Sequence, residues 1–284
     1  MAKVRLFNYL HGRVGDTTYF TRNGRTYAMQ ANVNKRKVTR KATQMATRTN
    51  WSNLVNFWKA YPCGAKPYFE GLRPGVTHYN HFFTLNLGSN RIFLTKEMAG
   101  NCACVVVPFI VSTGILPPIV VDRDDVGVRT NISLGDLNPL PTTTLGQLSL
   151  AIIKNNNDFH YKDIILYLLV RQHVDPTDGR PFISMSRTTL VLNPNSNTPI
   201  QHLLHPLEGF AARNGMLAAS VDPVGGMVWV HARCTSHNCL HVSTQHMVCN
   251  NQALINHYSS PEAFDAACQS YGGLTDDPML KPND

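Results

Sequence analysis

The chain has 284 residues, 43% of them hydrophobic and 15% charged, with 26 lysines and arginines against 18 acids and a formal net charge of +8. This composition is ordinary for a folded protein, and the length suffices for one large domain or two modest ones. No apolar run approaches the roughly 18 residues of a membrane helix, and the first residues, MAKVRLFNYL, are too polar for a secretory signal. We therefore expect a soluble protein without a membrane partner, in the cytosol or in a particle assembled there.

The positive charge is confined to the N-terminal part of the chain. Residues 1–50 contain eleven lysines and arginines and a single acid, Asp16, whereas the other 234 residues contain fifteen basic and seventeen acidic side chains. Such a segment suits a polyanion, either nucleic acid or an acidic protein surface. The alternative is a solvated, weakly structured arm. The candidate partner-binding residues are Arg13, Arg22, Arg25, Lys35, Arg36, Lys37, Arg40, Lys41 and Arg48.

The stretch YFTRNGRTYAM contains the strongest hairpin signal in the chain. Asn23-Gly24 suits a type I′ turn, which needs positive φ at both central residues, so residues 18–22 and 25–29 are predicted to pair as strands. One face would carry Tyr19, Thr21, Thr26 and Ala28, and the other Phe20, Arg22, Arg25 and Tyr27. Because a two-stranded hairpin is marginal in water, this one must lie on the rest of the domain or on another chain.

Residues 32–41, NVNKRKVTRK, have no apolar period and predict an extended connector that a partner would order. A helix is expected after it, with Thr39 as N-cap and with Pro62 and Gly64 ending it. Its polar first half offers no face for burial, so we expect only the second half to be buried and the basic start to be free to face a partner. The expected apolar stripe is Trp51, Leu54, Val55, Trp58 and Tyr61.

A second helix is predicted over residues 77–87, with Tyr79, Phe82, Phe83 and Asn86 on one side. The two helices would form a helical hairpin. We expect Trp51, Trp58, Phe82 and Phe83 to pack together.

Beyond residue 90 the pattern favours β structure, arranged as an antiparallel sandwich because the connections are short and rich in proline and glycine. Residues 145–154 fit either a strand or a short helix, and residues 200–212 predict a helix. Expected strands cover 103–112, 119–121, 126–133, 164–172, 182–193, 226–233 and 240–247, the last two as a hairpin.

A C-terminal helix is predicted from Glu262, with Ser259 as N-cap in a capping box and Gly272-Gly273 at its end. The fold class expected is therefore α+β, with a basic N-terminal hairpin and a two-helix segment before a mainly antiparallel, sandwich-like body. The expected parts are a basic hairpin and arm, a helical hairpin, a β-rich body with its C-terminal helix, and a flexible tail, at 1–41, 42–95, 96–273 and 274–284.

The sequence offers few candidates for catalytic or metal-binding residues. Five potential zinc ligands, His231, Cys234, His237, Cys239 and His241, fall within eleven residues, but the paired C-x-x-C spacing is absent, and cross-strand packing near a turn is the favoured interpretation. The seven cysteines are expected to be reduced and mostly buried. The acidic run at 122–125 reads as a solvated turn rather than a calcium loop.

No G-x-S-x-G, Walker, H-E-x-x-H or G-x-G-x-x-G pattern is present. We accordingly expect neither an enzyme nor a bound cofactor.

Several short motifs occur in a fixed order along the chain. They are GRVGD, TRNGRTY, RKATQMATR, HYNHFFTLN, STGILPP, VHAR, VSTQ and CQSYGG. Together they resemble a family of uncharacterised proteins from Bacteroidota and their phages, including the crAss-like group. The resemblance is strongest over residues 11–90, returns in 215–273 and is loose between them. The chain departs from the pattern in its histidines and cysteines at 231–241.

The resemblance implies a virion component: a ring or adaptor protein at the neck and tail, or a capsid-associated protein. It carries no enzymatic activity and no catalytic residues with it. We therefore expect a structural protein of a tailed bacteriophage that forms homo-oligomers through its basic N-terminal arm and contacts other virion proteins. The alternative is a nucleic-acid-binding protein that uses the same arm, with DNA as the partner.

Overall fold

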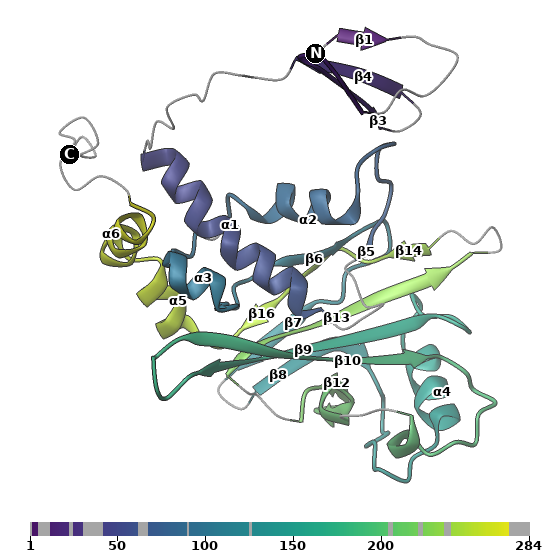
Figure 1. Ribbon diagram of the computed structural model, residues 1–284. Helices are drawn as coiled ribbons and strands as arrows, with labels where there is room; N and C mark the ends of the chain where they lie inside the picture. Colours follow the sequence, from purple (N-terminus) through teal and green to yellow (C-terminus); the bar gives the residue numbers. More distant parts are fainter. Residues whose placement is uncertain are drawn as a thin grey trace. The chain divides into compact units, whose positions relative to one another are not determined.

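A computed structural model of the chain (Figure 1) has two compact units, Met1–Arg40 and Lys41–Asp284, and each is considered by itself. Its helices and antiparallel sheets confirm the predicted α+β class. No helix among the described residues is long and apolar enough to cross a membrane. The described residues are 2–4, 12–22, 25–30, 42–61, 68–89, 91–124, 127–203, 207–220, 224–235 and 240–272.

The N-terminal unit is a four-stranded antiparallel sheet. Its strands lie in the order β1 (Ala2–Val4), β4 (Arg25–Gln30), β3 (Thr17–Arg22) and β2 (Gly12–Val14). The pairing of β3 with β4 confirms the predicted hairpin and both of its predicted faces. Asn23-Gly24 and the connector at 32–41, including Thr39, lie outside the described residues.

The larger unit is built on a central antiparallel sheet in the order β10 (Pro181–Val191), β9 (Ile164–Val174), β13 (Gly225–Cys234) and β14 (Leu240–Val242). A fifth strand, β16 (Val248–Cys249), also pairs with β13. Strands β9 and β13 are buried on both faces, which explains their nearly continuous apolar sequences, IILYLLV and GGMVWV. Alternate residues of each strand therefore contribute to two separate cores.

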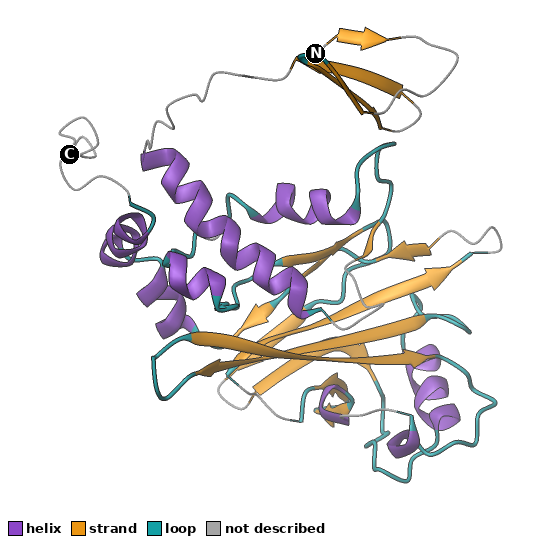
Figure 2. Cartoon of the chain, viewed as in Figure 1, coloured by secondary structure: helices purple, strands orange, loops and turns teal. Residues whose placement is uncertain are grey.

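Helices cover one face of the central sheet, as Figure 2 shows. They are α1 (Ala42–Ala60), α2 (His78–Asn86), α3 (Lys96–Gly100), α5 (Gln252–Tyr258) and α6 (Pro261–Ser270). A small sheet of β15 (Gln245–His246), β6 (Ile110–Thr113) and β5 (Tyr68–Phe69) lies among them, with β5 parallel to β6. Residues of α1, α2, α3, α5, β5 and β6 share one core with the central sheet, so the helices at 42–95 pack into the same core as the β-rich body.

The expected aromatic packing between α1 and α2 is confirmed. The ring centroids of Trp51 and Phe83 lie 4.3 Å apart, and those of Trp58 and Phe82 lie 5.4 Å apart. Phe57, which the expected stripe omitted, is fully buried and its ring lies 5.9 Å from that of Phe82.

A second sheet and one helix cover the opposite face. The sheet has the order β11 (Ala211–Arg213), β12 (Met216–Ala218), β8 (Gly127–Ser133) and β7 (Val121–Asp124). It shares a core with the central sheet and with α4 (Leu145–Asn155). Two antiparallel sheets thus pack face to face on this side, as the sandwich prediction required. The segment 145–154, which fitted a strand or a helix, is helical and begins with a Thr144–Gln147 capping box.

The segment at 103–109 corrects the sequence prediction. A strand was expected over 103–112, but only Ile110–Thr113 is a strand, and most of the preceding residues are fully buried without regular structure. Side-chain amides take the place of a neighbouring strand. Asn53 Nδ2 donates to Val105 O at 3.0 Å and Asn53 Oδ1 accepts from Val105 N at 2.8 Å.

Further amides continue this pattern along the segment. Gln172 Oε1 accepts from Val106 N at 2.9 Å, and Gln172 Nε2 donates to Cys104 O at 2.9 Å. Asn251 Nδ2 donates to Val106 O at 2.9 Å. The buried backbone therefore satisfies its polar groups without a sheet ladder.

The prediction that only the second half of α1 would be buried is wrong. Thr49 and Asn50, in the polar first half, are 0% and 2% exposed, and Asn53 in the second half is 1% exposed. Asn50 Nδ2 donates to Leu87 O at 2.8 Å, so this side chain ties α1 to the end of α2. Because residues three apart share a helix face, asparagines at 50, 53 and 56 form one buried amide row.

Other boundaries also differ from expectation. The helix predicted at 200–212 is replaced by two 3₁₀ turns, η1 (Ile200–His202) and η2 (Leu207–Gly209), followed by β11. Gly209 passes so close to the Tyr167 ring that a Cβ there would lie 2.4 Å from it.

Ser260 rather than Ser259 caps α6, because its Oγ accepts from Ala263 N. The acidic run begins in strand β7, and the predicted tail lies outside the described residues.

Replacing Asn53 tests the amide row. We expect Asn53→Ala to lower the free energy of unfolding by about 2–4 kcal/mol, because it leaves a buried N–H and a buried C=O without partners. Asn80→Ala, at an exposed position of α2, is the matched control and should change stability by less than about 0.5 kcal/mol. Urea denaturation followed by circular dichroism measures both; equal midpoints for the two variants would contradict this role.

Candidate interaction surface

The described residues of the N-terminal sheet form almost no core. Among its described side chains, Thr26 is the only buried one, at 6% exposure, and no buried apolar residue is found among them. Val14 and Met29 are 72% and 48% exposed. Burial of apolar surface contributes roughly 25 cal/mol per Å², so these described strands supply little of the main stabilising term of folding.

Strand register separates the charges of this sheet onto one face. Phe20 lies opposite Tyr27 and Arg22 opposite Arg25, while Arg13 pairs with Thr18 on the same face. The register also places Lys3 opposite Tyr27. We call the face defined by Lys3, Arg13, Phe20, Arg22, Arg25, Tyr27 and Met29 the basic face.

The basic face combines cations with an aromatic pair. The Phe20 and Tyr27 rings are stacked with their centroids 5.6 Å apart. The strand register pairs the positions of Arg22 and Arg25. Arg13 is exposed, donates to Gly15 O at 2.9 Å and lies 3.7 Å from Asp16.

Among the described strand residues, the opposite face of the sheet has no charged position. Tyr19 lies opposite Ala28, and Thr21 lies opposite Thr26, with their Oγ1 atoms 3.1 Å apart. The two faces therefore suit different surroundings, the neutral face an uncharged surface and the basic face a polyanion.

The other candidate residues do not all join this face. Arg48 lies on α1 in the larger unit, where its guanidinium is 5.0 Å from the centroid of the Tyr271 ring. Lys35, Arg36, Lys37, Arg40 and Lys41 lie outside the described residues. The sequence analysis did not predict the basic face as a whole. Lys3 and Arg13 lie on strands β1 and β2, and the Asn-Gly hairpin signal predicted only β3 and β4.

A buried charge cluster holds one end of the central sheet. His231 is 1% exposed, and its Nε2 lies 2.9 Å from Asp163 Oδ2. Arg233 donates to both carboxylate oxygens of Asp163 at 2.7 Å, and Phe159 stacks on His231 with centroids 4.3 Å apart. Burial alone would raise the pKa of the Asp163 carboxyl, but the hydrogen bonds from Arg233 and His231 outweigh it and hold this pKa far below its ordinary value.

This cluster removes His231 from the zinc candidates. His231 and Cys234 lie on opposite faces of β13, and Cys234 is exposed. His241 Nδ1 lies 2.5 Å from Glu70 Oε1 instead. Over the described residues, no group of three or more His, Cys, Asp or Glu side chains could hold a metal ion. His237 and Cys239 lie outside the described part of the chain.

The expectation that the cysteines are mostly buried is wrong for the five described ones. Cys104 is buried, Cys249 and Cys268 are half-buried, and Cys102 and Cys234 are exposed. Burial raises the pKa of the Cys104 thiol and raises that of Cys249 to about 12. These two thiols are therefore protonated near neutral pH and poor nucleophiles. Cys63 and Cys239 lie outside the described residues.

Comparison with known proteins does not identify a family for this chain. No protein-family model matches the chain, and neither the curated proteins nor the solved structures contain a match. The resemblance to phage proteins therefore stays a prediction.

The Asp163 cluster makes stability depend on pH. Because the pKa of Asp163 is lowered by folding, its contribution is present above the ordinary pKa of 3.8 and is lost as the pH falls below that value. We expect Asp163→Asn to lower the free energy of unfolding at pH 7 by about 3 kcal/mol and to weaken the acid dependence.

Asp122→Asn is the matched control. Asp122 is 59% exposed and pairs with Arg129 at 2.7 Å, and surface pairs of this kind contribute about 0–1 kcal/mol. Denaturant melts from pH 2 to 7 distinguish the two variants. A loss no larger in Asp163→Asn than in Asp122→Asn would contradict the role given to Asp163.

Proposed function

We propose that the protein is a structural subunit of a tailed bacteriophage particle and that it assembles with other copies of itself through its basic N-terminal segment. The observation that carries this proposal is the N-terminal sheet, whose strand register places basic positions on one face and whose described residues include no buried apolar side chain. Such a sheet gains its missing stabilisation when a partner covers it.

The distribution of charge along the chain supports a second copy of the chain as the partner. Residues 51–284 have a small excess of acids, whereas residues 1–50 carry ten net positive charges. The larger unit, Lys41–Asp284, has as many acids as lysines and arginines, so the N-terminal unit holds the positive excess and can pair with acidic patches on the larger unit of another copy. Head-to-tail contacts of this type connect unlike surfaces and close into rings when the rotation between copies allows it.

The assignment to a virion rests on the resemblance described above. Each of the proposed roles requires a subunit that binds its neighbours through an extended segment such as the N-terminal one. These roles are a neck or tail ring protein, an adaptor and a capsid-associated protein. The larger unit, with its two cores, supplies the rigid body that such a lattice needs.

Nucleic-acid binding is the second candidate, and the stacked Phe20 and Tyr27 favour it. Aromatic side chains on a sheet, surrounded by cations, can stack on unpaired bases while the cations contact phosphates. DNA or RNA would then take the place of the acidic protein surface.

Neutralising the basic face tests assembly. We expect the full-length chain to sediment as a homo-oligomer and the triple variant of Arg13, Arg22 and Arg25 to glutamine to shift toward monomer, because the charge complementarity is lost. The control triple changes Arg73, Arg91 and Lys154, exposed cations of the larger unit, to glutamine and should leave the oligomer intact. Electron microscopy and sedimentation velocity report the outcome. A wild-type chain that stays monomeric and is absent from purified particles would contradict the proposal.

A labelled single-stranded oligonucleotide tests the second candidate. If the basic face binds it, affinity should fall steeply with salt, since phosphate contacts release counterions. Phe20→Ala should weaken binding by about fivefold or more, because stacking contributes about 1–3 kcal/mol per base. Tyr19→Ala, on the neutral face, is the control. A flat salt response in fluorescence anisotropy would dismiss nucleic-acid binding.

A further inference from the structure

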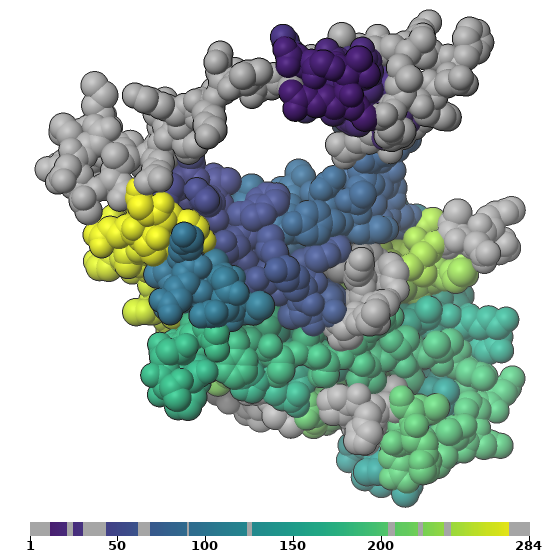
Figure 3. All heavy atoms as spheres, in the orientation of Figure 1, coloured from purple at the N-terminus to yellow at the C-terminus, as the bar shows by residue number. Residues whose placement is uncertain are grey.

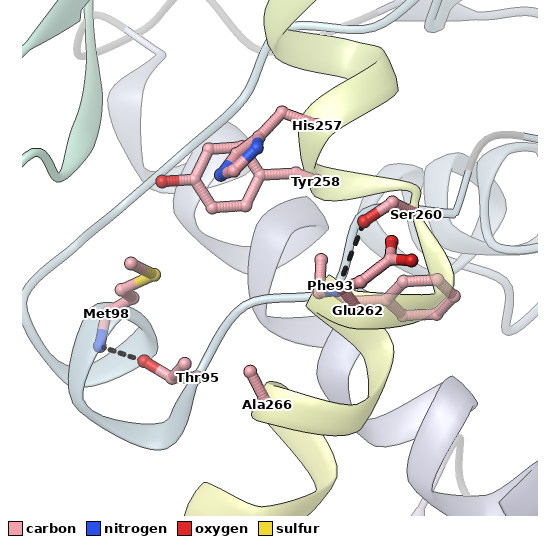
Figure 4. Close-up of a pocket in the computed structure, with 9 residues that line it drawn as sticks. Phe93, Thr95, Met98, His257, Tyr258, Ser260, Glu262 and Ala266 are labelled. Atoms are coloured by element: carbon pink, nitrogen blue, oxygen red, sulfur yellow. Dashed lines mark hydrogen bonds between the residues drawn. The ribbon is translucent and has the colours of Figure 1, made fainter.

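The larger unit has a surface cavity between α3 and the α5–α6 pair. Its volume is about 420 Å³, within the range of about 300–1,000 Å³ found for ligand pockets. On the molecular surface α6, drawn in yellow in Figure 3, lies beside α3, and Figure 4 shows the side chains between them. The lining residues are Phe93, Thr95, Met98, His257, Tyr258, Ser260, Glu262, Ala263 and Ala266.

The cavity has a polar group in its wall that other lining residues do not offer. Tyr258 is 6% exposed as a whole residue and lines the cavity with its ring and hydroxyl. The other hydroxyls of the lining are already engaged (Figure 4): Thr95 Oγ1 accepts from Met98 N and Ser260 Oγ accepts from Ala263 N, each at 3.2 Å. A tyrosine hydroxyl in the wall of a cavity can accept a hydrogen bond from a ligand that is a donor.

The charge around the cavity is negative. Glu262 lies in the lining itself, and Asp265 follows one turn later on α6. Glu97 and Lys96 on α3 offset each other. Asp178 is near enough that its charge, after burial, contributes to the raised pKa of Tyr258. The environment therefore disfavours an anionic ligand.

The walls are apolar and aromatic. Phe93, Met98 and the Tyr258 ring line the cavity, with Ala263 and Ala266 leaving space on the α6 side. An aliphatic stem packs on such walls while its charged head stays at the rim. A cation can also lie against an aromatic face. Lysine and arginine side chains have both properties.

We propose that this cavity receives a lysine or arginine side chain from the basic N-terminal segment of a second copy of the chain. Glu262 pairs with the charged head, the Tyr258 hydroxyl accepts a hydrogen bond from it, and Phe93 and Met98 contact the stem. The occupant is inferred from charge complementarity, because residues 1–50 hold the entire positive excess of the chain. This inference rests on the proposed function and gives the assembly contact a receiving site.

A fluorescent peptide with the sequence of residues 32–41, NVNKRKVTRK, tests the cavity on the full-length chain. We expect saturable binding that a peptide with glutamine at its five basic positions does not show. Glu262→Gln should weaken binding about tenfold, as expected for the loss of one charge-assisted hydrogen bond. Ala266→Trp should abolish binding by filling the cavity from an exposed position.

Asp136→Asn is the control, because Asp136 is exposed and its neighbours Leu134 and Leu137 pack in the core on the other side of the central sheet. It should bind the peptide as the wild type does. Peptide binding by Ala266→Trp at wild-type affinity, with thermal melts showing the variant folded, would overturn the proposal.

The same variants separate the two proposals. If Ala266→Trp still assembles while the basic-face triple variant does not, the N-terminal segment mediates assembly and the cavity is not its receiving site. If the wild type does not assemble at all, the proposed function fails, and peptide binding still decides whether the cavity accepts a basic side chain.

Discussion

The larger unit depends on a buried length of backbone that belongs to no sheet ladder among the described residues. Residues 103–109 run between the helices and the central sheet, where water cannot satisfy their polar groups. Amide side chains from α1, β9 and the start of α5 supply the missing hydrogen bonds, and Asn53 bonds both the N–H and the C=O of Val105. Because each amide is both donor and acceptor, this arrangement couples the helices to the sheet and leaves little freedom in how they pack.

The two units differ in what stabilises them. The larger one has two hydrophobic cores that share strands β9 and β13, and its buried carboxylate, Asp163, is paired with Arg233 and His231. The described residues of the N-terminal sheet form hydrogen-bonded strands with almost no core, and the strand register places the basic positions on one face. Our proposal that a second copy covers this sheet rests on that difference. The cavity at α3 and α6 is the receiving site that we propose for the contact.

Patterns with a local cause were predicted well from the sequence. The Asn23-Gly24 signal located the β3–β4 hairpin and its register, and the aromatic spacing at 77–87 located α2 with its Thr77 cap. Predictions failed where distant residues decide the structure. The run at 103–109 has the composition of a strand, and its apolar side chains are buried as in a strand, but amide side chains from distant elements hydrogen-bond its backbone in place of a sheet ladder. The Gly209 turn likewise depends on the Tyr167 ring, which is far away in sequence.

The sequence by itself determined the fold class, most strands and helices, and the concentration of positive charge before residue 50, because these follow from local periodicity and composition. Only the tertiary structure decided which charges share a surface. Strand register places the positions of Lys3 and Arg13 on the same face as the hairpin arginines. Arg48 lies in the larger unit, beside the Tyr271 ring. The His231 side chain pairs with Asp163 and is not grouped with the other zinc candidates. The tertiary structure also formed the cavity from α3 and α6, about 165 residues apart in the chain. Such groupings depend on contacts between distant residues, and no local pattern encodes them.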